Sequence, residues 1–312
     1  MAFLDGLKST GIILSGFGFA VFVIFVYVYV MKRFGRRRFP FSDPALRIPG
    51  QKLRERLDDE MFDFGADAGI VLAIPSIMYA LHLKALVADG VQRPGNVIFL
   101  GILGVGMTVG LVWRILTRLH RVRFYRIGLA GEVAVGEALN QLMLQGYRVF
   151  HDVRGGSDFN VDHVVVGPAG VFAVETKTRT KRESRGGKAE YRLTYDGRSL
   201  SFEGQPGKRQ TEFLDQATRN AKWISNWLSR AVGERVSARA VLALPGWYIE
   251  RKGVGAVLVM NHKEVQTAIP KARTAQPLRP EQIQRIAHQL EQRCRDVELA
   301  PKIMRKQKVA LT

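Results

Sequence analysis

Residues 159–178, FNVDHVVVGPAGVFAVETKT, decide the fold of this chain. Two runs rich in valine and phenylalanine flank the turn-forming sequence GPAG, a pattern that predicts two adjacent strands. Three charged residues interrupt these runs, namely Asp162, Glu175 and Lys177. An unpaired charge removed from water costs on the order of several kcal/mol, so a buried strand does not carry such residues without a reason.

The alternation of side chains along a strand predicts where these charges point. Glu175 and Lys177 are two residues apart, so both project from one face of their strand while Thr176 projects from the other. Asp162 lies in the preceding strand, where pairing would bring it beside Glu175. Two carboxylates at one sheet edge form an oxygen-ligand site for a hard divalent cation, and a nearby lysine can orient a water molecule or hold a phosphate.

A set of internal salt bridges that closes the sheet is the structural alternative for these three residues. Buried ion pairs are weak evidence for stability, which favours a functional role. His163 follows Asp162 and is predicted to point to the opposite face of the sheet, as a core histidine. His151, at the end of a strand, has the same structural interpretation.

The composition fits one enzyme-sized domain and a further module within 312 residues. A formal net charge of +19 indicates an anionic partner, either nucleic acid or phospholipid, and charge alone does not choose between them. The one cysteine, Cys294, excludes an intramolecular disulfide and a zinc–cysteine cluster. A reduced, cytoplasmic working domain is therefore expected.

Residues 1–126 are predicted to form a membrane region. Residues 11–31 are uncharged and long enough for a helix to cross roughly 30 Å of hydrocarbon, and the basic residues at 32–38 place their C-terminal end in the cytoplasm. A cleaved signal peptide fits poorly, because the apolar core is too long and no small-residue cleavage site precedes the basic residues. Residues 47–64 are expected to form a cytoplasmic loop with one short amphipathic helix.

Two further apolar stretches occupy residues 69–87 and 96–116. The first is interrupted by Pro75, His82 and Lys84, so a re-entrant or amphipathic hairpin is the alternative there. The second leads into a series of arginines that marks a cytoplasmic exit. About three spans would place the N-terminus outside, which predicts a multi-pass protein of the cell inner membrane with its C-terminal domain in the cytoplasm.

The soluble part is expected to begin near Gly128 with a helix that stops at Gly146. Alternation around Asp196-Gly197 predicts a hairpin with a type I′ turn. Further strands are expected at 147–153, 238–244 and 256–260, and further helices at 213–228 and 280–297. This order predicts an α/β fold over 127–268, followed by a C-terminal helix and basic tail over 269–312.

Several short motifs recur in the order and turn context of one known family. They are Gly128, Gly131 and Glu132; Asn160-Val161-Asp162-His163; Gly167-Pro168; Gly170-Val171-Phe172; Glu175-Thr176-Lys177; Tyr195-Asp196-Gly197; Asp215-Gln216-Ala217; and Asn220-Ala221. On these residues, positions 128–265 resemble the nuclease-related domain NERD, a branch of the PD-(D/E)XK nuclease superfamily. Val161 occupies the position of the proline in the superfamily's name. The NERD branch commonly has an apolar residue there, so the resemblance extends to this position.

The resemblance implies a restriction-endonuclease-like core, that is, a mixed sheet flanked by helices. It implies Asp162, Glu175 and Glu132 as ligands of magnesium or manganese, and Lys177 as the cation that orients water. Gln216 is implied as a contact to the site or the substrate, with an ordinary solvent-facing role as its alternative. Glu132 also has a structural alternative, because a carboxylate near a helix N-terminus is favoured by the helix dipole.

The segment after Lys177 is basic, and its cations are candidates for contacting a phosphate backbone. They are Arg179, Lys181, Arg182 and Arg185. A solvated loop is the alternative, and because no aromatic residue is interleaved, no stacking platform for single strands is indicated in this segment. The sequence thus predicts a membrane-anchored, magnesium-dependent nuclease-like protein acting on nucleic acid, with DNA favoured over RNA. The alternative is a catalytically silent module that binds nucleic acid or protein at the membrane.

Overall fold

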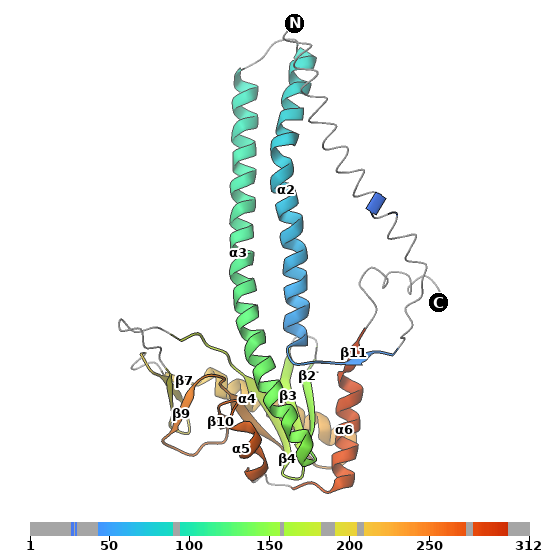
Figure 1. Ribbon diagram of the computed structural model, residues 1–312, viewed down its shortest axis with the longest axis vertical. Coiled ribbons are helices and arrows are strands. Elements are labelled where there is room, and N and C mark those ends of the chain that lie inside the picture. Colours follow the sequence, from blue (N-terminus) through green and yellow to red (C-terminus); the bar gives the residue numbers. More distant parts are fainter. Residues whose placement is uncertain are drawn as a thin grey trace. The chain divides into compact units, whose positions relative to one another are not determined.

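The computed structural model describes residues 26–27, 29, 43–89, 94–156, 159–181, 191–204, 209–272 and 277–298 (Figure 1). The predicted first span at 11–31 lies outside the described residues except for three helical positions. The described chain forms two compact units. One contains residues 64–116 of a helical hairpin, and the other contains residues 44–63 and 117–297.

The hairpin consists of two long helices, α2 (Gln51–Asp89) and α3 (Pro94–Asn140), which run side by side (Figure 1). Both are long and apolar enough to cross a membrane, and only 11% and 6% of their apolar windows are buried inside the protein. An apolar surface left this exposed differs from the buried core helix of a soluble protein and is consistent with membrane association. The predicted stretches 69–87 and 96–116 lie within these two helices, and Pro75 is accommodated inside α2.

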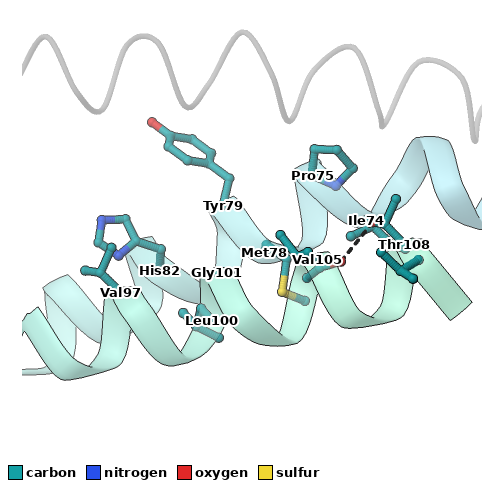
Figure 2. A pocket seen from close by; sticks show the side chains of 12 residues that line it. Ile74, Pro75, Met78, Tyr79, His82, Val97, Leu100, Gly101, Val105 and Thr108 are labelled. Atoms are coloured by element: carbon teal, nitrogen blue, oxygen red, sulfur yellow. Dashed lines mark hydrogen bonds between the residues drawn. The ribbon is translucent and has the colours of Figure 1, made fainter.

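A groove of about 500 Å³ runs between the two helices within this unit (Figure 2). Close packing forms its floor, since a Cβ added to Gly104 would lie 3.0 Å from Cγ of Met78. The hydroxyl of Thr108 donates a hydrogen bond to the carbonyl of Gly104 at 2.8 Å, as the dashed line in Figure 2 shows, so it is satisfied within its own helix. The groove is therefore almost entirely apolar, with Tyr79 and His82 as its polar margin.

The larger unit is built on a five-stranded mixed sheet in the order β10-β8-β4-β3-β2. Its strands are β2 (Arg148–Arg154), β3 (Asn160–Gly167), β4 (Gly170–Thr176), β8 (Ala238–Ala243) and β10 (Leu258–Met260). The pairs β2–β3 and β3–β4 are antiparallel, whereas β4–β8 and β8–β10 are parallel. The α/β fold predicted from the sequence is confirmed.

Helices cover both faces of this sheet. The end of α3, the 3-10 turn η1 (Gln141–Gln145) and α5 (Val265–Lys271) pack on one face. The amphipathic helices α4 (Glu212–Val232) and α6 (Pro280–Cys294) pack on the other. Because both faces are covered, β4 is buried along its whole length, which explains its nearly continuous apolar sequence.

A smaller sheet, in the order β7-β6-β5-β9, joins the core on the α4 side. It contains β5 (Arg192–Tyr195), β6 (Leu200–Phe202), β7 (Arg209–Gln210) and β9 (Tyr248–Arg251). The predicted hairpin is present, but its connection is longer than a two-residue type I′ turn, because Tyr195 pairs with Leu200. Asp196 closes this loop by accepting backbone hydrogen bonds from Arg198 and Ser199 at 2.9 and 2.6 Å.

The segment before α2 packs against the C-terminal part of the larger unit, to which it belongs. Its short strand β1 (Ala45–Leu46) pairs with β11 (Arg295–Val297), the strand that follows α6. Arg47, only 4% exposed, lies between Asp152 and Asp296 and is 2.7 Å from each carboxylate. Residues more than 100 positions apart are thus held together by a buried arginine.

Two predictions about helix boundaries are wrong. Residues 47–64 do not form a loop with a short helix, because α2 begins at Gln51 and continues into the apolar stretch. The helix predicted to begin near Gly128 is the end of α3. No proline interrupts residues 95–140, so the helix continues to Asn140 and is followed by η1, whose left-handed C-cap is Gly146.

The two buried histidines face each other across β2 and β3. Their Nδ1 atoms are 2.9 Å apart, and Nε2 of His151 is 3.0 Å from the side-chain oxygen of Asn140. The structural interpretation of His163 is supported, since it points away from Asp162 into the α3 side of the sheet. Burial lowers the pKa of His151 to about 4, and burial together with His151 lowers the pKa of His163 well below its ordinary value.

We predict that acid destabilises the fold through this histidine pair. An unfolded histidine has a pKa of about 6.5, so the unfolded chain binds more protons than the folded one below that pH. The free energy of unfolding should therefore fall as the pH drops from about 6.5 towards 4. Thermal unfolding of a His163→Gln variant should depend less on pH over this interval. The exposed His288→Gln variant is the control, and parallel curves for His163→Gln and wild type would contradict the assignment.

Candidate active site

The pairing of β3 with β4 brings two carboxylates together. The register places His163 opposite Val174, so the next pair along the ladder is Asp162 and Glu175. The backbone N–H of Thr176 donates a hydrogen bond to Oδ2 of Asp162 at 2.7 Å, which fixes the aspartate at the end of β4. Opposed residues in an antiparallel pair point to the same face, so both carboxylates lie on the side covered by α4.

Glu175 is held by two donors. Its Oε1 is 2.7 Å from Nζ of Lys177, and its Oε2 accepts a hydrogen bond from Nδ2 of Asn220 on α4, also at 2.7 Å. The glutamate is 2% exposed, whereas the side chain of Lys177 keeps 27% of its surface in solvent. The lysine ammonium is 5.9 Å from the centre of the Phe213 ring. One side of this arrangement is therefore fixed, and the amine remains open to solvent.

Glu132 belongs to α3, the helix that packs on the face of the sheet opposite α4. Close packing requires a glycine beside it, because a Cβ at Gly131 would lie 1.7 Å from Oγ1 of Thr178. A second glycine, Gly50, precedes α2 with φ of +71°, and a Cβ there would be 3.6 Å from Oε2 of Glu132. The carboxylate thus sits between the start of α2 and the end of β4.

Burial raises the pKa values of all three carboxyl groups, and neighbouring carboxylates raise those of Glu132 and Asp162 further. Burial, followed by the charges of Asp152 and Glu175, raises the pKa of Glu132 to about 7. Burial, with Glu175 and Glu132, raises the pKa of Asp162 well above its ordinary value. For Glu175 burial also raises the pKa, opposed by Lys177, Asn220 and Arg219. Three acidic groups share one nearby lysine, so the site holds more negative charge than its own cation balances.

The donor chemistry of these residues fits a hard divalent cation. Carboxylate oxygens are the ligands that magnesium and manganese prefer, and the uncompensated charge is what such an ion would offset. Among the residues that the structure describes, no three acidic, histidine or cysteine side chains are already gathered as a metal site. Donor types therefore fit the ion, while the ligand shell is not preassembled.

Comparison with known families adds a second, independent observation. The family model of the nuclease-related domain (NERD) matches residues 127–245. This part of the chain is a nuclease-related domain. No curated protein and no solved structure matched the chain. The match includes Glu132, Asp162, Glu175, Lys177 and Gln216, and the mixed sheet flanked by helices is the architecture that the resemblance implied.

The nuclease-related domain brings together four of the five predicted catalytic residues. Glu132, Asp162, Glu175 and Lys177 are linked by the contacts and charges described above. Glu132 is not near a helix N-terminus, because it lies far along α3, so the helix-dipole alternative is wrong. Gln216 lies one turn before Asn220 on α4, and it is Asn220 that contacts Glu175.

The sequence placed Asn220 among the family motifs, but its contact with Glu175 was not predicted. It is 5% exposed and shares the buried face of α4 with Leu214, Ala217, Ala221 and Ile224. A lone amide on an otherwise apolar helix face needs a buried partner, because an unsatisfied amide costs roughly 1–3 kcal/mol. That signal was available in the sequence, four residues after Gln216.

Asp152 is a second residue whose role was not predicted, and unlike Asn220 it has no local sequence signal. It has a positive φ of 51° and accepts hydrogen bonds from Arg47, from the backbone N–H of Lys52 and from Asn160. The bond to Lys52 caps the N-terminus of α2 with a carboxylate, where the helix dipole favours negative charge. Asp152 therefore connects the start of the apolar hairpin with the wall of the site that holds Glu132.

Two of the four predicted phosphate-binding cations are described. Arg179 lies over the ring of Phe202 at 4.2 Å and Lys181 over that of Trp247 at 5.8 Å. Both rings are buried, so they hold the cations and are closed to stacking bases. The two rings come from β6 and from the loop before β9, so no aromatic residue of the basic segment itself is involved. Arg182 and Arg185 lie outside the described residues.

We predict that Glu132→Gln stabilises the folded protein at alkaline pH. Folding raises the pKa of this carboxyl group from near 4.5 to about 7. Above pH 7 the group is ionised in both states, and its burial in the folded state then lowers the free energy of unfolding. Removing the charge should raise the free energy of unfolding at pH 8 by up to about 3 kcal/mol, at about 1.4 kcal/mol per unit of pKa, and change it little at pH 4. Thermal unfolding measures this.

The matched control is Glu137→Gln, an exposed glutamate on the same helix, which should leave stability unchanged. If the acidic groups were a salt-bridge set that closes the sheet, Glu132→Gln would instead destabilise the protein at pH 8.

We also predict that Arg47→Met destabilises the larger unit by about 3–5 kcal/mol, because Asp152 would remain buried without its cation. Arg121→Met is the matched control. It removes an arginine that pairs with Glu60 at 2.8 Å in a more exposed setting, where solvent screens the ion pair and its loss should change stability little. Equal destabilisation in denaturant unfolding would show that the Arg47 network does not hold the N-terminal segment in place.

Proposed function

We propose that this chain is a membrane-anchored nuclease that hydrolyses phosphodiester bonds of nucleic acid on the cytoplasmic side. The observation that carries the proposal is the meeting of Asp162, Glu175 and Lys177 at one end of the sheet, inside a domain that is nuclease-related. An ion-pair set alone needs one carboxylate for one lysine, whereas this site adds two further acidic groups at the cost of stability.

In this proposal Asp162 and Glu175 hold magnesium or manganese, with Glu132 completing or supporting the site. Such an ion lowers the pKa of an attacking water and offsets negative charge on the phosphate. Lys177 orients the water, since its amine is partly exposed and fixed by Glu175. Asn220 holds the second oxygen of Glu175, so the carboxylate has one orientation. Arg179 and Lys181 contact the phosphate backbone, with DNA favoured over RNA.

The lipid bilayer is the second proposed partner. The apolar hairpin leaves the larger unit at residue 63 and returns to it at residue 117, so two crossings place both ends on one side. Arginines at 114, 118, 121, 123 and 126 follow the second crossing, as expected for a cytoplasmic exit from an inner membrane. With the stretch at 11–31 as a further span, the protein is multi-pass with its nuclease-related domain in the cytoplasm.

A catalytically silent module that binds nucleic acid or protein at the membrane is the second candidate. It is favoured by the full occupation of Glu175, whose two oxygens already contact Lys177 and Asn220. A silent domain would retain the basic surface while its carboxylates serve only structure.

Hydrolysis is tested with the full-length protein in detergent and labelled DNA and RNA, single- and double-stranded, with magnesium, manganese or chelator. We expect cleavage that needs metal and that falls at least about 100-fold in Lys177→Ala, as when one preorganised electrostatic group is lost. Lys252→Ala is the matched control. It removes the lysine of another Glu-x-Lys pair, Glu250 and Lys252. This pair is exposed, and Nζ of Lys252 is 3.6 Å from Oε1 of Glu250.

Cleavage that persists in Lys177→Ala or in chelator would reject the mechanism. Magnesium binding no tighter than that of an Asp162→Ala, Glu175→Ala double variant, together with absent cleavage, would favour the silent module.

A further inference from the structure

An aromatic and cationic cluster lies on the surface between α4 and α6, and none of its members belongs to the proposed catalytic set. It consists of Phe159, Trp223, Trp227 and Arg293, called here the aromatic platform. The two indole rings are parallel within 5° with centroids 5.8 Å apart, and the Phe159 ring meets Trp223 edge-on at 5.5 Å. The guanidinium of Arg293 lies 5.1 Å from the Trp223 ring and 4.8 Å from the Trp227 ring.

These side chains are only partly buried. Phe159 is 38% exposed, and both tryptophans and Arg293 are intermediate between core and surface. One side of the tryptophans packs against the core beneath α4. Large aromatic groups that stay half in water while a core lies beside them are typical of binding surfaces, because they bring rigid stacking area at low entropic cost.

The aromatic platform is continuous with the candidate active site. Phe159 directly precedes β3 and stands three residues before Asp162. Asn220, which contacts Glu175, is three residues before Trp223 and seven before Trp227, so all three lie on one face of α4. The platform and the carboxylates therefore share one end of the sheet and one helix face.

Positive charge surrounds this surface. Arg293 forms part of the platform, and its Nε donates a hydrogen bond to the carbonyl of Arg154. Arg219 lies one turn before Trp223 on α4 and is close enough to Glu175 to favour its ionised form. An anionic ligand with flat rings matches this combination of charge and aromatic faces.

We propose that the aromatic platform binds unpaired bases of single-stranded nucleic acid and leads the strand to the carboxylates. This inference rests on the proposed function and narrows its substrate to strands with an unpaired segment. Bases in a duplex are stacked on each other, so only unpaired bases reach protein aromatics and guanidinium planes. The backbone of the same strand would follow Arg219 towards the site.

Binding is tested without cleavage, using full-length Lys177→Ala protein in detergent with chelator and an oligothymidylate of about 12 nucleotides. We expect a saturable change in tryptophan emission. Trp247 is 1% exposed and Trp113 lies in the apolar hairpin, so the change reports on Trp223 and Trp227. Trp227→Leu should weaken binding about tenfold, the loss of one stacked base, whereas Trp227→Phe should retain most of the affinity.

The matched control is Tyr125→Leu. It removes an aromatic ring of α3 that also makes a cation–π contact, with Arg56 of α2 at 5.9 Å. It should bind the oligonucleotide like the parent protein. Thermal unfolding identifies any variant that fails to fold. If Trp227→Leu fails to fold, the comparison is made with Trp227→Phe, which should fold and keep most of the affinity. Wild-type affinity in Trp227→Leu, or duplex binding with the same dependence on the tryptophans, would overturn the proposal. Binding at the platform without metal-dependent cleavage by Lys177-containing protein would reject the nuclease function and leave the platform intact.

Discussion

The register of β3 against β4 is the constraint on which the candidate site depends. With His163 opposite Val174, Asp162 and Glu175 share the face under α4, and the histidines share the other. A slip of one residue would send every side chain of one strand to the opposite face, so the carboxylates would separate and buried valines would lose their core. The GPAG turn and the two-sided burial of β4 both specify this register, and the same forces that fold the sheet therefore assemble the acidic pair.

Charge in the site works against stability. Three carboxyl groups with raised pKa values lie around one lysine, and burial is the main cause in each case. Such strain persists only where the surrounding structure over-determines it, which is typical of binding and catalytic sites. Here the surroundings are the buried amide of Asn220, the backbone N–H that holds Asp162, and the glycines that let α2 and α3 approach the strand ends.

The compact unit that contains the matched residues 127–245 extends beyond them. Strand β11 and helix α6 follow the match, whereas β1, Arg47 and the start of α2 come before the apolar hairpin, yet all of them pack on the same unit. Glu132 itself is carried by α3, the helix that also contains an apolar membrane-length stretch. The site therefore borders the residues of α2 and α3 that belong to this unit, through Asp152 at the start of α2 and Glu132 in α3.

The sequence by itself determined the α/β class, the strand pair, the grouping of Asp162, Glu175 and Lys177, and the apolar stretches, because alternation, turn residues and hydrophobic runs are local properties of the chain. Asn220 was also within its reach, as a polar residue on an apolar helix face. Only the tertiary structure decided that α3 is continuous, that Arg47 neutralises Asp152 from 105 residues away, and that the rings of Trp223 and Trp227 meet Arg293. Those arrangements depend on which elements pack together, and no local pattern encodes the distance between residues that only folding brings into contact.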